Sequence, residues 1–208
     1  MNLFQRGRTF ASLFALGSFA VVGCSSTDDS STPAPLEVTG TVGGITVPSV
    51  DSAGVIATFE PNTPGINTSP DPVTLMLVAV ADKTNLCGYR SSPPSTTALS
   101  FILGVKGRSI AAGTYNVGAV DLNDAGSSAH SLAAAFATTD AQCKPSTATS
   151  VISGKVTIDN VSASSVSGSF DFIFQDGSAK GNFTTSLCFT ADEFSKLGQS
   201  CATSGDAG

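Results

Sequence analysis

Residues 153–188 read SGKVTIDNVSASSVSGSFDFIFQDGSAKGNFTTSLC, and this stretch decides the fold class. In three successive runs the larger side chains fall on every second residue, which is the period of a β-strand with one face in a core. The residues between them are mostly polar, with Ile173 as the exception, as expected for the solvated outer face of an antiparallel sheet. The pair Asp176-Gly177 predicts a tight hairpin turn between the second and third runs, because these residue types tolerate positive φ. The alternating large residues are Val156, Ile158, Phe170, Phe172, Phe174, Phe183, Thr185 and Leu187.

Further strands are expected along the rest of the chain, separated by segments rich in Gly, Pro and Asp. Val73 to Ala81 is apolar at both alternating sets of positions, which predicts a strand covered on both faces; a buried helix is the alternative. Ser131 to Thr138 is rich in Ala and fits a weak strand or a short helix, and residues 140–150 are expected to be a connection. The other expected strands are Leu36 to Val47, which turns at Gly43-Gly44, Gly54 to Glu60, Leu99 to Val105 and Ala112 to Val117.

One short helix is expected after the last strand. Thr190 and Glu193 have the spacing of a capping box, in which each side chain accepts a hydrogen bond from the backbone N–H of the other residue. The helix is predicted from Ala191 to Leu197 and ends at Gly198, since glycine commonly terminates helices. Residues 202–208 are expected to fray.

The composition supports a β-rich domain. Charged residues make up only 12% of the chain and there is no Trp, while Gly, Ser, Thr, Val and Ala are abundant, and this profile favours strands over helices. Residues 36–201 have the length of one domain with a single core. The sequence therefore predicts one all-β domain, an antiparallel β-sandwich of about eight or nine strands with one short C-terminal helix.

Residues 1–23 have the features of a secretory signal peptide. Arg6 and Arg8 precede an apolar run from Phe10 to Val22, which is shorter than the roughly 20 residues of a membrane span. The run ends in Val21-Val22-Gly23-Cys24, which resembles the lipobox of bacterial lipoproteins. This resemblance implies cleavage before Cys24 and lipidation of Cys24, and Ser25 after it is consistent with delivery to the outer membrane.

Residues 24–35 are expected to form a disordered tether, because Ser, Thr and Pro dominate and no large apolar side chain is present. Removal of Arg6 and Arg8 with the signal peptide leaves 8 basic against 16 acidic residues, so the net charge changes from −6 to −8. Nucleic acid is therefore an unfavourable partner. The expected location is the cell envelope, with the N-terminal acyl chains anchored in the outer membrane.

Turn glycines and core aromatics form a pattern over nearly all of the mature domain. It comprises Gly40-Thr41-Val42-Gly43-Gly44 with Pro48, Ala112-Gly113-Thr114-Tyr115, Gly154-Lys155-Val156-Thr157-Ile158, Ser167-Gly168-Ser169-Phe170 and Gly181-Asn182-Phe183. The pattern resembles small bacterial surface lipoproteins of unknown function, of the kind found among myxobacteria. That resemblance implies a β-sandwich and no reaction, because its motifs are turns and core residues.

The sequence offers few candidates for catalysis. His130 is the only histidine, so a two-His metal site cannot form within one chain, and no G-x-S-x-G motif is present. Thr149 stands where a Walker A motif ending in Gly154-Lys155 requires glycine. A calcium loop that begins at Asp121 would need Glu where Leu132 stands. No catalytic, metal or cofactor-binding residue is predicted, and dispersed carboxylates stay open as an alternative.

Four cysteines remain once Cys24 is lipidated, an even number in an exported chain, which predicts two disulfides. Three pairings are possible. We expect Cys87–Cys143 and Cys188–Cys201, because the second bond would join the last strand to the short helix. Metal binding by these cysteines is the competing interpretation, and the absence of C-x-x-C spacing argues against it.

The sequence thus predicts a lipid-anchored, non-enzymatic module that binds a protein or glycan ligand or contributes to envelope structure, without a cofactor. The alternative function is that of a carboxylate-dependent extracytoplasmic hydrolase, for example one that acts on glycans. A pocket with converging acids would favour the hydrolase.

Overall fold

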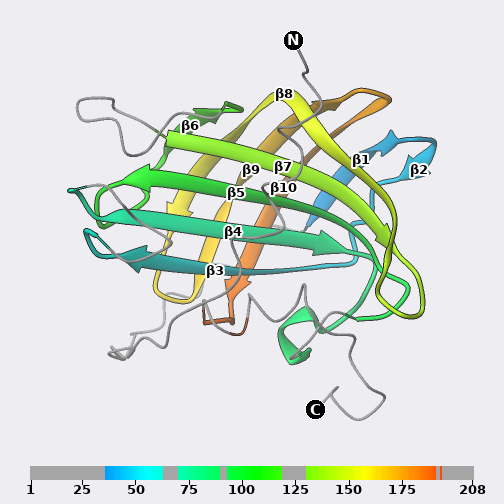
Figure 1. The fold of residues 1–208 in the computed structure, drawn as a ribbon, viewed down its shortest axis with the longest axis horizontal. Helices are drawn as coiled ribbons and strands as arrows, with labels where there is room; N and C mark the ends of the chain where they lie inside the picture. Colours follow the sequence, from blue (N-terminus) through cyan, green and yellow to red (C-terminus); the bar gives the residue numbers. More distant parts are fainter. Residues whose placement is uncertain (1–35, 63–69, 90–92, 119–129, 191–192, 194–208) are drawn as a thin grey trace.

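The computed structural model describes residues 36–62, 70–89, 93–118, 130–190 and 193 of the chain (Figure 1). These residues are mostly in strands, so the all-β prediction is confirmed. Within these ranges no helix has the length and apolar character of a membrane span. The elements are β1 (Glu37–Val42), β2 (Ile45–Thr46), β3 (Asp51–Phe59), β4 (Val73–Ala81), the 3-10 helix η3 (Leu86–Gly88), β5 (Thr97–Lys106), β6 (Gly113–Asn116), β7 (His130–Thr139), β8 (Pro145–Val161), β9 (Ser165–Phe174) and β10 (Gly177–Leu187).

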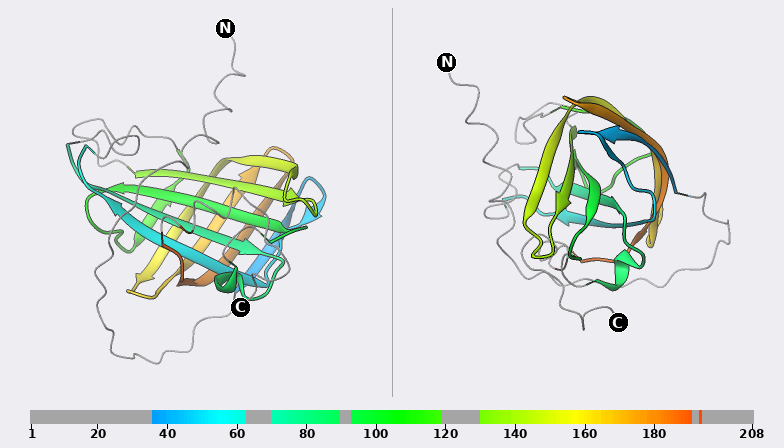
Figure 2. Two further views of the ribbon diagram at one scale, coloured as in Figure 1. Left: turned by 60° about the horizontal axis from the view of Figure 1, so that its bottom comes forward. Right: turned by 90° about the vertical axis from the view of Figure 1, so that its right-hand side faces the viewer.

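Seven of these strands close into a barrel. Around it, β9, β10, β3, β4, β5, β7 and β8 are hydrogen-bonded neighbours, and β8 returns to β9. All these pairs are antiparallel except β10 with β3, which pair in parallel through Ser186 with Ala53 and Leu187 with Gly54. The predicted β-sandwich is therefore wrong in its finer detail, because its two layers are joined into one closed sheet (Figure 2).

The barrel has two walls. Figure 1 shows β3, β4, β5 and β7 side by side, with β8, β9 and β10 crossing behind them. We call the first group the front wall and the second group the back wall. Phe101 of the front wall packs against Phe170, Phe172 and Phe183 of the back wall, with ring centroids 5.4 to 6.3 Å apart. All four rings are buried, which confirms the alternation predicted for the back wall.

β8 connects the walls because it is long and bent. Its residues up to Ser150 pair with β7, and Lys155 to Ile158 pair with β6 on the edge opposite β9. A β-bulge lies between Val151 and Ser153, and bulges increase local twist and bend a strand. A Cβ at Gly154 would lie 2.2 Å from the carbonyl oxygen of Asp171, so the absence of a side chain allows β9 to approach.

β10 connects the walls at the opposite seam in the same way. Gly177 to Asn182 pair with β1, and Ser186 and Leu187 at the end of the strand pair with β3. The β1–β2 hairpin therefore lies beside the first part of β10, and β3 lies beside the end of β10 on the same edge. Gly43 and Gly44 at its turn have φ values of 58° and 76°, which glycine adopts without strain, and the predicted hairpin is confirmed.

The turn between β9 and β10 lies one residue earlier than predicted. Gln175 and Asp176 form it, while Gly177 already pairs with Phe174. Gly177 is needed for a different reason, because a Cβ there would lie 2.0 Å from the carbonyl oxygen of Thr41 in β1. This glycine makes room for a neighbouring strand.

Two stretches with weak sequence patterns are strands. Residues 131–138 lie in β7, so the strand alternative for them is correct. Residues 145–150, which were expected to be part of a connection, form the beginning of β8. That expectation was wrong because these Ser, Thr and Ala residues pair along β7 without the large apolar side chains that reveal a strand.

The predicted capping box is confirmed. The backbone N–H of Thr190 donates to Oε2 of Glu193 at 3.0 Å, and the backbone N–H of Glu193 donates to Oγ1 of Thr190 at 3.2 Å. Most of the helix expected at residues 191–197 lies outside the described residues, as do the signal peptide, the whole tether with Cys24, and the tail.

Candidate functional site: an apolar pocket outside the barrel

The floor of the pocket is the outer face of the front wall. In β4, Met76, Val78 and Val80 belong to the barrel core, whereas Ala79 and Ala81 point the other way. The floor is made of methyl groups because alanines from four neighbouring strands coincide in register. Ala81 pairs with Ala98, Ala98 pairs with Ala137, and Ala53 pairs with Ala79.

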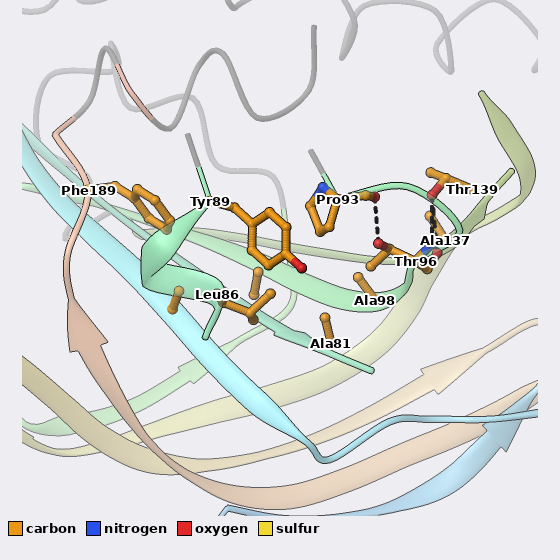
Figure 3. Close-up of a pocket in the computed structure, with 11 residues that line it drawn as sticks. Ala81, Leu86, Tyr89, Pro93, Thr96, Ala98, Ala137, Thr139 and Phe189 are labelled. Atoms are coloured by element: carbon orange, nitrogen blue, oxygen red, sulfur yellow. Dashed lines mark hydrogen bonds between the residues drawn. The ribbon is translucent and has the colours of Figure 1, made fainter. Parts of the chain in front are cut away.

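The walls of the pocket come from the connection between β4 and β5 and from the segment after β10. Leu86, Tyr89, Pro93 and Thr96 belong to the connection, and Phe189 follows β10 (Figure 3). Together with Thr139 and the alanine floor they enclose about 180 Å³. Leu86 and Phe189 are both buried, and they lie on the same side of the pocket (Figure 3).

A disulfide joins two sides of this pocket. Cys87 bonds to Cys188, and these residues are the direct neighbours of Leu86 and Phe189. The parallel contact of β10 with β3 brings Cys188 to this place, where its N–H donates to the carbonyl oxygen of Gly54 at 3.2 Å. The bond therefore ties the pocket connection to the end of the back wall.

The expected pairings Cys87–Cys143 and Cys188–Cys201 are wrong, because Cys87 and Cys188 bond to each other. Cys143 is also disulfide-bonded, and Cys201 lies outside the described residues. The short sequence separation of Cys188 and Cys201 favoured a disulfide between them. It contained no information on the closure of the barrel, which places the end of β10 beside β3.

Asp51 holds the same connection by hydrogen bonds. Its Oδ2 accepts the backbone N–H of Leu86 and its Oδ1 accepts that of Ser52, both at 2.8 Å. The carboxylate therefore links the first residue of β3 to η3 across the edge of the pocket. Bonds to an ionised acceptor are stronger than those between neutral groups.

The pocket contains few polar groups, and most of them are already paired. Oγ1 of Thr96 donates to the carbonyl oxygen of Pro93 at 2.6 Å, and Oγ1 of Thr139 accepts the backbone N–H of Thr96 at 3.0 Å. The hydroxyl of Tyr89 has no hydrogen bond to any described residue, and Figure 3 shows it directed into the pocket. No charged side chain is among the lining residues with described positions.

The residues weighed for catalysis lie elsewhere. His130 begins β7 rather than lying in a loop, and its ring is 5.3 Å from that of Tyr115 in an edge-on contact. Its Nε2 is 3.2 Å from the backbone nitrogen of Asn116. Leu132 is buried in the barrel and cannot contribute to a calcium loop, while Asp121 lies outside the described residues.

The described carboxylates do not converge. Glu60 forms a two-point ion pair with Arg108, and Asp140 accepts backbone N–H groups in its own turn. Asp82 has a buried oxygen without a hydrogen-bond partner in the described part of the chain, but it is not among the lining residues. Among the residues with described positions, no three His, Cys, Asp or Glu side chains gather as a metal site requires.

Comparisons of the chain with known protein families, with curated proteins and with solved structures found no match. The site is therefore interpreted from its own chemistry. The sequence analysis missed the pocket residues, and the available signal was the doubly apolar pattern of Val73 to Ala81. That pattern indicated that other residues pack on the outer face of β4, but it did not indicate which residues these are.

Proposed function

We propose that the protein is a lipid-anchored module of the bacterial cell envelope that binds a small apolar ligand without changing it chemically. The observation that carries this proposal is the pocket of about 180 Å³, whose described lining residues have apolar or hydroxyl-bearing side chains and include no acid, base or thiol. Small-molecule sites are typically concave, mostly apolar and equipped with few polar groups. A glycan would need more hydrogen-bonding groups than the Tyr89 hydroxyl, the one side-chain group without a hydrogen bond among the described lining residues, provides.

The anchoring part of the proposal rests on the sequence of residues 1–24. Cys24→Ala removes the proposed lipidation site, and each buried CH₂ of an acyl chain contributes about 0.8 kcal/mol to membrane binding. The variant should move from the membrane fraction to the soluble fraction on cell fractionation. Retention in washed membranes would contradict lipid anchoring and would leave the pocket proposal unaffected.

The binding part is tested by native mass spectrometry of the full chain after incubation with envelope extract. The intact chain should carry a small compound of unchanged mass. Ala98→Leu should lose it, because the larger side chain fills the pocket floor. Ala57→Leu is the matched control, since Ala57 lies on the outer face of β3 opposite Leu75 and is not a lining residue.

Two outcomes would contradict the proposal. Equal ligand retention in Ala98→Leu and in the unaltered chain would place binding elsewhere. Release of the compound with a changed mass would favour the hydrolase instead.

A further inference from the structure

The size of the pocket limits what can enter it. The cavity measures about 180 Å³. An apolar cavity of about 150 Å³ in another protein stays dry and binds benzene. One six-membered ring with a small substituent therefore fits within it.

The described lining favours a neutral ligand. None of the eleven lining residues that the structure describes is Asp, Glu, Lys, Arg or His. A charged group that lost its hydration here would gain no charged partner from these eleven residues, which is a large cost. We therefore take the group that enters to be neutral.

Among the described lining residues, Tyr89 gives the pocket a point of polar selectivity. The hydroxyls of Thr96 and Thr139 are already hydrogen-bonded within the protein. The Tyr89 hydroxyl has no described partner and points into the cavity (Figure 3). Tyr89 is only partly buried, so water can reach its hydroxyl in the empty pocket. A ligand that offers an oxygen at this position replaces that water and accepts the hydrogen bond.

We propose that the pocket binds a neutral compound with a single aromatic ring and one hydrogen-bonding oxygen, and that this oxygen pairs with the hydroxyl of Tyr89. This inference rests on the proposed function of the pocket as a ligand site. The methyl groups of Ala81, Ala98 and Ala137, which are neighbours in register, offer an apolar surface to the face of a ring. The side chains of Tyr89 and Phe189 add aromatic surface, and aromatic contacts contribute beyond their buried area.

Phenol and toluene are the probes that test this, because they have the same ring and differ by a hydroxyl in place of a methyl group. Their binding to the purified full chain is measured by NMR titration. Tyr89→Phe should weaken phenol binding about three- to tenfold, the effect of one hydrogen bond, and leave toluene binding unchanged. Ala98→Leu should abolish binding of both probes, and Ala57→Leu should change neither.

Results other than these contradict either the proposed ligand class alone or the pocket's role as a ligand site. If Tyr89→Phe leaves phenol binding unchanged, or weakens both probes equally, the ligand class is wrong while the pocket remains a ligand site. If neither probe binds the unaltered chain, or if Ala98→Leu still binds both, the inference and the pocket's role in the proposed function both fail. Ala137→Leu fills the same floor and serves as the second pocket variant if Ala98→Leu does not fold.

Discussion

The two walls of the barrel share one interior but differ on the outside. In the back wall, Lys155, Asp171 and Lys180 are paired in register across β8, β9 and β10 and are all exposed. In the front wall, the corresponding outward row is Ala81, Ala98 and Ala137. The back wall is therefore covered on one face only, whereas the front wall has a second apolar face that a connection partly covers.

This difference explains where the candidate site arises. An antiparallel sheet can leave one face in water, so a polar outer face needs no partner. The front wall instead has a second cluster that includes Ala53, Val55, Ala81, Leu86 and Phe189 outside the barrel. The pocket lies at this second cluster. A strand sequence that is apolar at both alternating sets of positions therefore indicates where such a pocket can form.

The largest expected effect comes from the interior side of the back wall. Phe172→Ala should lower the free energy of unfolding by roughly 3 to 5 kcal/mol, because the buried ring is lost and a cavity remains. Asp171→Ala, one residue away on the outer side, should change it by less than about 0.5 kcal/mol. Chemical denaturation measures both, and similar values for the two variants would show that the back wall is not one-sided.

The next effect concerns the bond between the walls. Replacing both Cys87 and Cys188 by Ser should lower the free energy of unfolding by about 2 to 4 kcal/mol, because the bond constrains residues 101 positions apart in the unfolded chain. Denaturation under non-reducing conditions measures the loss. Hydrogen exchange should also accelerate in η3 more than in the back wall.

Peptide mapping without reduction provides the control for this variant. The unaltered chain should give a peptide linking Cys87 to Cys188 and, by elimination among the four cysteines, one linking Cys143 to Cys201. A peptide linking Cys87 to Cys143 would contradict the structure of the pocket.

Much of the barrel could be predicted from the sequence, because its strands have a simple period. Phe170, Phe172 and Phe174 identify β9 directly, and Gly43-Gly44 identifies the first hairpin. Local signals of this kind need no knowledge of distant contacts. The capping box of Thr190 and Glu193 was predictable for the same reason.

The closure and the site were not predictable because they depend on contacts between distant residues. The pairing of β10 with β3 involves two residue pairs, and no sequence period encodes it. The Cys87–Cys188 bond follows from that closure. The pocket floor consists of alanines on four strands, and an alanine at an outward position has the same appearance in sequence whether it is covered or exposed.

A smaller effect is expected where the connection is attached to the front wall. Asp51→Ala removes the acceptor for the N–H groups of Leu86 and Ser52, and should lower the free energy of unfolding by about 1 to 3 kcal/mol. Asp51→Asn keeps one acceptor oxygen and should cost less. Amide exchange at Leu86 should accelerate in Asp51→Ala, and unchanged exchange would show that the carboxylate does not hold the connection.

The smallest effects test the two outer faces with the same new side chain. Ile173 in β9 is 48% exposed, so Ile173→Thr should change the free energy of unfolding by less than about 0.5 kcal/mol, since threonine retains the β-branched shape that strands favour. Leu77 in β4 packs against the second cluster, and Leu77→Thr should cost about 1 kcal/mol, because a half-buried leucine loses part of its burial energy. Thermal unfolding of the two variants measures the difference between the walls. Equal losses of unfolding free energy in the two variants would mean that the outer face of the front wall is no more buried than that of the back wall. The front wall would then have no second apolar cluster to form the pocket.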